Sequence, residues 1–238
     1  MKIVDAVWEK RNLGVNTVEI EVEQNDTTPE VKRYLEELGT AYQVLKIPNS
    51  RFDMSQVAGD CQFHFVEGMM KLSNMLMDIS RTSVQQRMYD AVSIQNMNHE
   101  DIDYLFNEIK AGMFDSDRIS IDPYFGKRQA AERYAGWIED EIERNTEFIK
   151  YVYKDETIGF FTLRESTQGV YVSVLGGIYK RFRKSGIGTV VKVPEAVKVR
   201  GGKQLEVYVS TNNIIQIKTL LINGYVPKSV HYVYVKHM

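Results

Sequence analysis

The stretch Tyr171-Val-Ser-Val-Leu-Gly-Gly-Ile178, followed by Tyr179-Lys-Arg-Phe-Arg-Lys-Ser-Gly-Ile-Gly188, decides the fold. An apolar run typical of a β-strand leads through a basic turn with two glycines into a segment that begins like a helix. Glycine lets the backbone approach a phosphate closely, and the unpaired N–H groups at a helix N-terminus bind anions. The stretch therefore predicts either a phosphate or pyrophosphate site or an ordinary strand-to-helix turn with a solvated basic face.

Composition excludes several classes of function. The chain has 238 residues, with 30 Lys and Arg against 32 Asp and Glu, so nothing favours nucleic acid or an acidic membrane surface as partner. A single cysteine, Cys61, rules out an internal disulfide framework and suggests a reducing compartment. The apolar start of the chain is too short for a signal peptide or a membrane span. We therefore expect a cytoplasmic protein that binds neither nucleic acid nor membrane.

Residues 1–83 are expected to form a small α/β unit. Residues 17–23 alternate apolar and charged side chains, which predicts a half-buried strand, and residues 29–38 carry a helical apolar stripe. Two further strands are expected at 41–47 and 62–66. Residues 67–83 are rich in methionine without strong periodicity, which favours a linker.

Residues 84–238 alternate strands and helices. Strands are expected at residues 88–94, 148–153, 158–163, 170–178, 204–210 and 225–236. Helices are expected after Asn98, over residues 131–142, and from Asn213 to Gly224, because asparagine caps helix starts and glycine ends helices. Pro194 should kink or shorten the helix that follows the basic turn. The polar loop 114–123 is long enough to suggest a function.

This order resembles the GNAT superfamily of acyl-CoA-dependent N-acyltransferases over residues 84–238. The segment Arg183-Lys-Ser-Gly-Ile-Gly188 matches the R/Q-x-x-G-x-G/A turn of that superfamily, and Asn213, Gly224-Tyr225 and Asn98-His-Glu-Asp-Ile-Asp103 stand at its other usual positions. A Rossmann or Walker A motif would need a glycine at Val191 or at Arg183, and neither is present. The resemblance implies an α/β (α+β) fold with a central mixed, mostly antiparallel sheet flanked by helices, after a smaller, partly GNAT-like N-terminal domain.

A narrower resemblance covers the front of the chain. Trp8-Glu9, Gly14-Val15-Asn16 and Phe65-Val-Glu-Gly68 are similar to the N-terminal region of bacterial dTDP-4-amino-4,6-dideoxygalactose (dTDP-fucosamine) N-acetyltransferases. This resemblance implies a nucleotide-linked amino sugar as acceptor. The N-terminal unit and the loop 114–123 would then frame the acceptor pocket, and Arg118 could bind an acceptor phosphate or be a solvated loop arginine.

The resemblance implies acetyl-CoA as co-substrate and no metal. Space at Gly176-Gly177 would hold the acetyl group, or would mark a β-bulge without ligand. Arg183 could contact the pyrophosphate or only hold the turn. The implied cofactor-binding residues are Gly176, Ile178, Arg183, Lys184, Ser185, Gly186, Ile187, Gly188, Thr189 and Asn213.

The proton donor is the main departure from the superfamily. The tyrosine that often protonates the departing thiolate stands four residues before Gly224-Tyr225 in that superfamily, a position that Leu220 occupies here. Tyr208, Ser210 and Tyr225 could replace it, or could only pack. The function expected is N-acetylation of a small amine, with an amino acid or a protein terminus as alternative acceptor. Because of Leu220, a binding module without catalysis is the rival class, and the first unit could mediate a homodimer.

Overall fold

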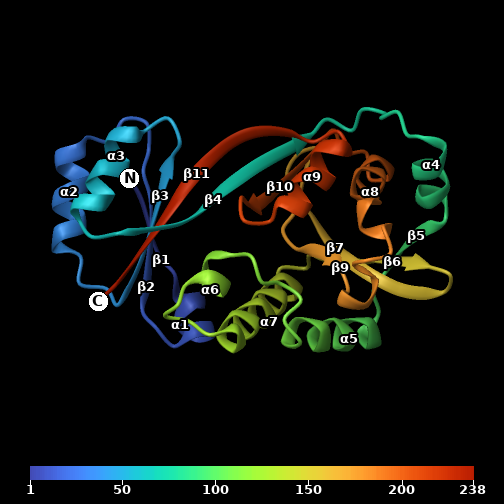
Figure 1. Cartoon of the computed structure of the whole chain (residues 1–238), viewed down its shortest axis with the longest axis horizontal. Helices are drawn as coiled ribbons and strands as arrows, with labels where there is room; N and C mark the ends of the chain where they lie inside the picture. Colours follow the sequence, from blue (N-terminus) through green and yellow to red (C-terminus); the bar gives the residue numbers. More distant parts are fainter.

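A computed structural model describes all 238 residues and has one sheet between two layers of helices (Figure 1). The strands are β1 (Lys2–Asp5), β2 (Thr17–Glu21), β3 (Tyr42–Pro48), β4 (His64–Asn74), β5 (Val92–Asn96), β6 (Glu147–Tyr153), β7 (Glu156–Thr167), β8 (Val170–Ser173), β9 (Gly176–Ile178), β10 (Gln204–Ser210) and β11 (Val226–His237). Their order in space is β1-β2-β3-β11-β4-β10-β8-β7-β6-β5, and β9 pairs with β7. Only β2/β3 and β8/β10 are parallel, so the sheet is mixed and mostly antiparallel, which confirms the expected fold class.

Helices cover both faces of this sheet. They are α1 (Val7–Leu13), α2 (Thr28–Glu37), α3 (Phe52–Asp60), α4 (Ser83–Asp90), α5 (His99–Lys110), α6 (Arg118–Ile121), α7 (Lys127–Glu143), α8 (Val193–Val199) and α9 (Ile214–Ile222). Successive strand residues point to opposite faces, so Phe148 packs with α5 and α7 whereas Ile149 packs with α8 and α9. In the same way Val44 packs with α1 and α6, and Leu45 with α2 and α3. None of the helices is long and apolar enough to cross a lipid bilayer.

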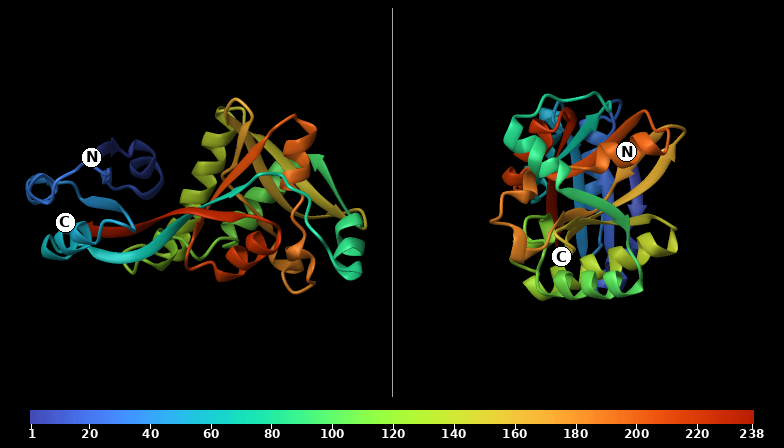
Figure 2. Two further views of the ribbon diagram at one scale, coloured as in Figure 1. Left: turned by 90° about the horizontal axis from the view of Figure 1, so that it is seen from above. Right: turned by 90° about the vertical axis from the view of Figure 1, so that its right-hand side faces the viewer.

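The two halves of the chain share one topology and exchange a strand. The first half runs β2-α2-β3-α3-β4 and the second runs β8-α8-β10-α9-β11, each beginning with a parallel pair. The final strand of each half pairs with the other half, since β4 pairs with β10 and β11 pairs with β3. Figures 1 and 2 show β11 returning the C-terminus to the half that holds the N-terminus. The sheet is therefore continuous across the expected division at residues 83 and 84, which stays a prediction.

Two local expectations are wrong, each for a physical reason. Residues 67–74 are part of β4 and not of a linker, because β4 is buried between two strands and shows no clean alternation. The strand expected at 88–94 begins only at Val92, since a capping box of Thr82 and Gln85 starts α4 just before it. By contrast, the expectation that Pro194 kinks or shortens its helix is met by shortening: α8 has seven residues and begins only at Val193, with Pro194 in the first turn, where its missing N–H is harmless.

The expected helix caps are confirmed. The side chain of Asn98 accepts a hydrogen bond from the Asp101 N–H at the start of α5, and that of Asn213 accepts one from the Gln216 N–H at the start of α9. Gly224, with φ 78°, follows the end of α9. These caps fix where α5 and α9 begin, and the start of α9 borders the cavity described below.

Candidate functional site

A β-bulge separates β8 from β9. Along β7, Arg164 pairs with Val172 and Phe161 pairs with Gly176, so one extra residue stands on the β8–β9 side. Thr162 is fully buried at this point. Its Oγ1 accepts hydrogen bonds from the N–H groups of Val174 (3.2 Å) and Leu175 (3.0 Å), and it donates to the Leu175 carbonyl at 3.1 Å. A bulge bends the strand that carries it. A bulge was one of the two expectations for Gly176-Gly177; the structure places it directly before this pair, at Val174 and Leu175, where Thr162 holds it.

The bend leaves one edge of β9 without a partner strand. β8 pairs with β10 only over Val170–Ser173 and Gln204–Val207. The other edge of β9 pairs with β7. There the Leu175 carbonyl accepts a hydrogen bond from the Thr162 N–H at 2.8 Å, and the Tyr179 N–H donates one to the Ile158 carbonyl at 2.9 Å. Backbone groups alternate in direction along a strand, so those of Gly176 and Ile178 point away from β7. An extended molecule with amide groups could pair with this edge.

The basic turn beyond β9 is built from two 3₁₀ segments, Lys180–Phe182 and Ile187–Thr189. Gly186 has φ 77°, a conformation that favours glycine, and Ile187 anchors the turn in the core. The helix expected to begin here is displaced to Val193, because Pro194 fits only the first turn of a helix. The turn is therefore not the N-terminus of an α-helix, and no α-helix dipole contributes to anion binding there.

The turn keeps free donors and is held by its own side chains. The N–H groups of Lys184 and Gly186 have no partner within the chain. The Ser185 hydroxyl donates a hydrogen bond to the Phe182 carbonyl at 2.6 Å, and the Thr189 hydroxyl donates one to the Gly186 carbonyl at 2.9 Å. Arg183 donates to the carbonyl of Met113 and, at 3.4 Å, to that of Ile178. Of the two roles left open for Arg183, these contacts favour holding the turn.

A cavity of about 450 Å³ opens between the sheet and the layer that contains α1 and α7. Gly176 lies in its wall, so the free edge of β9 borders it. Tyr208 and Ser210 also line it from β10, and Asn213 from the start of α9. From the first half of the chain the cavity receives Trp8, Asn12, Glu19, Lys46, Glu67 and Met69. Both halves therefore build this one cavity.

The candidate proton donors lie in different places. Tyr208 is about half exposed and Ser210 is buried, and both border the cavity. Tyr225 is 2% exposed in the core, where burial raises the pKa of its hydroxyl, and it does not border the cavity. Leu220 is likewise a core residue. The structure thus brings two of the three candidates to the cavity, and their catalytic roles stay predictions.

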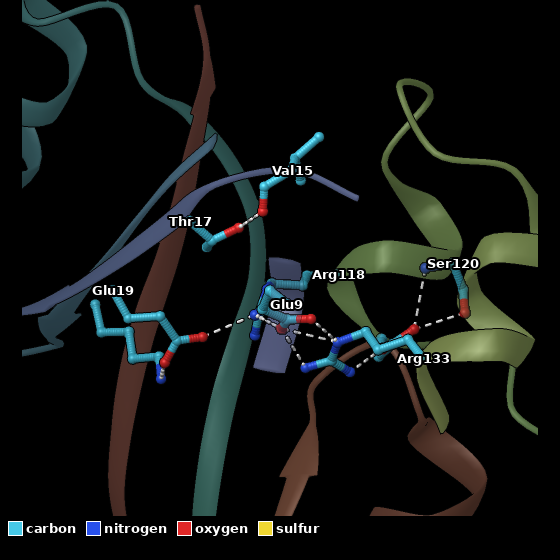
Figure 3. Close-up of polar contacts among 9 residues, drawn as sticks. Glu9, Val15, Thr17, Glu19, Arg118, Ser120 and Arg133 are labelled. Atoms are coloured by element: carbon cyan, nitrogen blue, oxygen red, sulfur yellow. Dashed lines mark hydrogen bonds and ion pairs between the residues drawn. The ribbon is translucent and has the colours of Figure 1, made fainter. Parts of the chain in front are cut away.

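Arg118 reaches the cavity but is already bound by carboxylates. Its Nη2 lies 2.6 Å from Glu9 and 2.7 Å from Glu19, and its side chain is 8% exposed (Figure 3). Arg133 contacts the same Glu9 carboxylate at 2.9 Å. The expectation of a solvated loop arginine is wrong, because part of the loop forms α6 against the first half. A contact of Arg118 with an acceptor phosphate stays a prediction that these ion pairs do not favour.

Glu67 is a cavity residue that sequence reasoning did not select. It is 1% exposed on β4, and its Oε2 has no hydrogen-bond partner. Burial raises the pKa of Glu67, and hydrogen bonding by Ser210 together with the charge of Arg118 opposes this only in part. The sequence shows only a charged residue within the run Phe65-Val-Glu-Gly68. That this residue is buried becomes clear only once the strands that pair with β4 are known.

Known proteins resemble this chain in fold. No protein-family model and no curated protein matches its sequence. A GCN5-related N-acetyltransferase from Sphaerobacter thermophilus superposes with a TM-score of 0.67 at 11% identity, over 99% of this chain and 75% of that one. A tandem GNAT protein from the clavulanic acid biosynthesis pathway gives 0.56 at 9% identity, over 94% and 76%. A GCN5-related glucosamine N-acetyltransferase region of a fungal GH3 β-N-acetylglucosaminidase gives 0.57 at 12% identity, over 81% and 25%.

The chain has the GNAT fold. At these identities the likeness establishes the architecture, with its mostly antiparallel sheet flanked by helices. What the chain does must be argued from its own cavity, turn and strand edge.

Proposed function

We propose that this protein transfers the acetyl group of acetyl-CoA to the primary amine of a small acceptor. The observation that carries the proposal is the free edge of β9, which joins the glycine turn at one end and borders a cavity at the other. A molecule with an anionic group, an extended amide-containing arm and a reactive end matches these three features in that order. Acetyl-CoA has this construction, and it supplies an activated acetyl group.

The residues suited to bind acetyl-CoA are those with backbone N–H groups or charged side chains that have no partner within the chain. The unpaired N–H groups of Lys184 and Gly186, with the exposed Lys184 ammonium, would bind the pyrophosphate. The backbone of Gly176 and Ile178 would pair with the pantetheine arm, and an N–H at this edge would polarise the thioester carbonyl. The Ser185, Ile187, Gly188 and Thr189 backbone shapes the turn around that group.

For the acceptor we propose an amino sugar carried on a nucleotide. Trp8 and Trp137 line the cavity and offer flat apolar surfaces for a sugar or a base. Arg144 and Arg164 also line it, and they share the single carboxylate of Glu141, at 2.8 and 3.5 Å. Two cations on one carboxylate leave a net positive charge that suits a phosphate. Acceptors without phosphate, such as amino acids or protein termini, are the alternative.

A second candidate function is acetyl-CoA binding without catalysis. It is favoured by Leu220, an apolar core residue where related proteins often carry a tyrosine. A lost proton donor lowers rates by roughly 10² to 10⁴. This candidate predicts binding of acetyl-CoA with no release of thiol.

The test is a thiol-release assay with acetyl-CoA and four classes of amine: amino-sugar nucleotides, amino acids, polyamines and peptides. We expect turnover with the first class. Binding is measured in parallel as the increase of the melting temperature with acetyl-CoA. Binding without turnover in all four classes would refute the enzyme and support the second candidate.

A pair of glycine variants tests the turn. Gly186→Ala and Gly201→Ala each place a side chain at positive φ, 77° and 73°, with no atom closer than 3.6 Å to the new Cβ. Both should lose similar stability, about 1 kcal/mol. Only Gly186→Ala should weaken acetyl-CoA binding, because Gly201 lies in the turn between α8 and β10. Equal affinity of both variants would contradict the pyrophosphate assignment.

A further inference from the structure

The cavity contains one charge without a counter-ion. Of the charged side chains that line it, every basic one lies within 4.0 Å of a carboxylate, and every acidic one except Glu67 lies within 4.0 Å of a basic group. The pairs are Lys46–Glu19, Arg118–Glu19, Arg118–Glu9, Arg133–Asp117, Arg144–Glu141, Arg164–Glu141 and Arg11–Asp140. The cavity therefore offers one uncompensated carboxylate.

This carboxylate is held on rigid structure and aimed at the cavity. Val233 of β11 pairs with Glu67, and the next pair is Tyr234 with Phe65, so Val66 is an extra residue beside Glu67. Such a bulge re-aims the side chains next to it. On the other side of β4, Ser210 of β10 pairs with Met69, and Glu67, Met69 and Ser210 all border the cavity. Glu67 thus shares the wall that continues to Gly176.

A buried carboxylate without a counter-ion is unfavourable, and folded proteins rarely keep one. A cation from outside the chain would relieve it. We propose that Glu67 binds the ammonium group of the acceptor and removes its proton, an inference that rests on the proposed acetyl transfer. Oε2 is the atom free to accept, since it has no partner in the chain.

The proton balance is simple. The ammonium group gives one proton to the Glu67 carboxylate, and the freed lone pair of nitrogen forms the N–C bond while the C–S bond of the thioester breaks. A second proton leaves nitrogen and reaches the thiolate sulfur. Glu67 then releases its proton to water, so the sum is acetyl-CoA plus ammonium giving acetamide, CoA thiol and one proton.

The surroundings suit a base. The groups that face Glu67 are the Ser210 hydroxyl from β10, Arg118 and Asp117 from the α6 region, and Arg133 from α7. Burial raises the pKa of Glu67 against the charges of both arginines. A carboxylate whose pKa is raised toward neutrality is a stronger base, and a catalytic base is most effective when its pKa lies near the working pH.

The experiment compares Glu67→Gln with Glu206→Gln in the full chain. Glu206 is a matched control because it lies on the neighbouring strand β10, carries the same charge, and is paired with Lys71 at 2.8 Å outside the cavity. We expect Glu67→Gln to lower kcat/KM at least 100-fold. The acid limb of the pH–rate profile should disappear with it, and acetyl-CoA affinity should stay unchanged. Glu206→Gln should keep the rate and the acid limb.

Melting temperatures give a readout besides activity. A raised carboxyl pKa means that the folded state binds a proton more tightly than the unfolded state. Stability is therefore lost as the pH rises through the range above the ordinary value of 4.5. Glu67→Gln removes the buried charge, so at pH 8 it should raise the melting temperature by about 2 °C or more, whereas Glu206→Gln should not. If Glu67→Gln does not raise the melting temperature at pH 8 but lowers it as much as Glu206→Gln does, the proposal is overturned, because Glu67 would then be only structural.

The outcomes also separate this inference from the proposed function. If the wild type turns over an amine and Glu67→Gln keeps the acid limb, the role of Glu67 is refuted and acetyl transfer stands. If the wild type turns over no amine, glucosamine and N-acetylglucosamine serve as probes that differ in the ammonium group. If glucosamine raises the melting temperature of the wild type but not of Glu67→Gln, and N-acetylglucosamine raises neither, Glu67 binds ammonium groups although the protein is not an enzyme for these amines. No such increase would overturn both.

Discussion

Thr162 is the residue on which the geometry of the site depends, and replacing it with valine tests this directly. Valine has nearly the shape of threonine but no hydroxyl. In Thr162→Val the N–H groups of Val174 and Leu175 lose their acceptor. The Leu175 carbonyl keeps the hydrogen bond from the Thr162 N–H. The substitution therefore removes the clamp of the bulge and leaves the rest of the strand pairing in place.

The magnitude follows from the two orphaned donors. A buried donor without acceptor costs about 1–3 kcal/mol, and the Val174 N–H, which is only partly buried, costs the smaller amount. We expect a loss of about 2–4 kcal/mol in the free energy of unfolding. For a chain of this size that corresponds to a decrease of roughly 10 °C in melting temperature. Acetyl-CoA should also bind more weakly, because the free edge of β9 is no longer held apart from β10.

The assay is urea unfolding, with Thr162→Ser as the matched control. Serine keeps the hydroxyl and loses one buried methyl group, which costs about 1 kcal/mol. The reasoning requires valine to be more damaging than serine. It is refuted if the two variants lose equal stability, or if Thr162→Val binds acetyl-CoA as tightly as the wild type.

Three further predictions follow from buried polar groups and from the two halves. Tyr225→Phe should leave activity and stability nearly unchanged, because the Tyr225 hydroxyl is buried without a partner; a large loss of rate would show that it is the proton donor. Burial raises the pKa of Glu19, but Arg118 and Lys46 outweigh it and lower the pKa to about 2, so its ion pairs stabilise the fold above pH 4.5 and this stabilisation is lost as the pH falls toward 2. Acid titration of the free energy of unfolding should therefore show a decrease of about 3 kcal/mol that Glu19→Gln lacks. Calorimetry should give one acetyl-CoA per chain, and a second equal site would contradict the assignment of the turn to one half only.

What could be predicted from the sequence is what local residues determine. Asn98 and Asn213 cap their own helices, and the glycine at position 186 sets the turn by its own φ. These features need only a few neighbouring residues, so a short motif reports them. The strand β10 was also found at its observed bounds, because it alternates over its whole length.

What the sequence could not show depends on pairing between distant segments. Thr162 looks like an ordinary strand residue until the extra residue between β8 and β9 is known. Glu67 looks like an edge charge until β4 is placed between β11 and β10, and Arg118 looks solvated until Glu9 and Glu19 approach it from the first half. In each case the environment of a polar side chain depends on a second segment of the chain, 13 residues away for Thr162 and Leu175 and 109 residues away for Arg118 and Glu9.

The two halves explain why a duplicated topology carries one candidate site. In the first half β2 pairs with β3 along all five of its residues, so no strand edge opens between them. The segment that follows, Val22-Glu-Gln-Asn-Asp-Thr27, has neither a basic residue nor a glycine, and its Asp26 instead holds the N-terminal ammonium group at 2.5 Å. This half therefore lacks the free strand edge and the glycine turn on which the proposed acetyl-CoA site of the second half depends. It contributes β4, which separates β10 from β11 and carries Glu67. Removing residues 1–82 would therefore take away a central strand and a wall of the cavity together, so the first half is a structural part of the site and not a separable attachment.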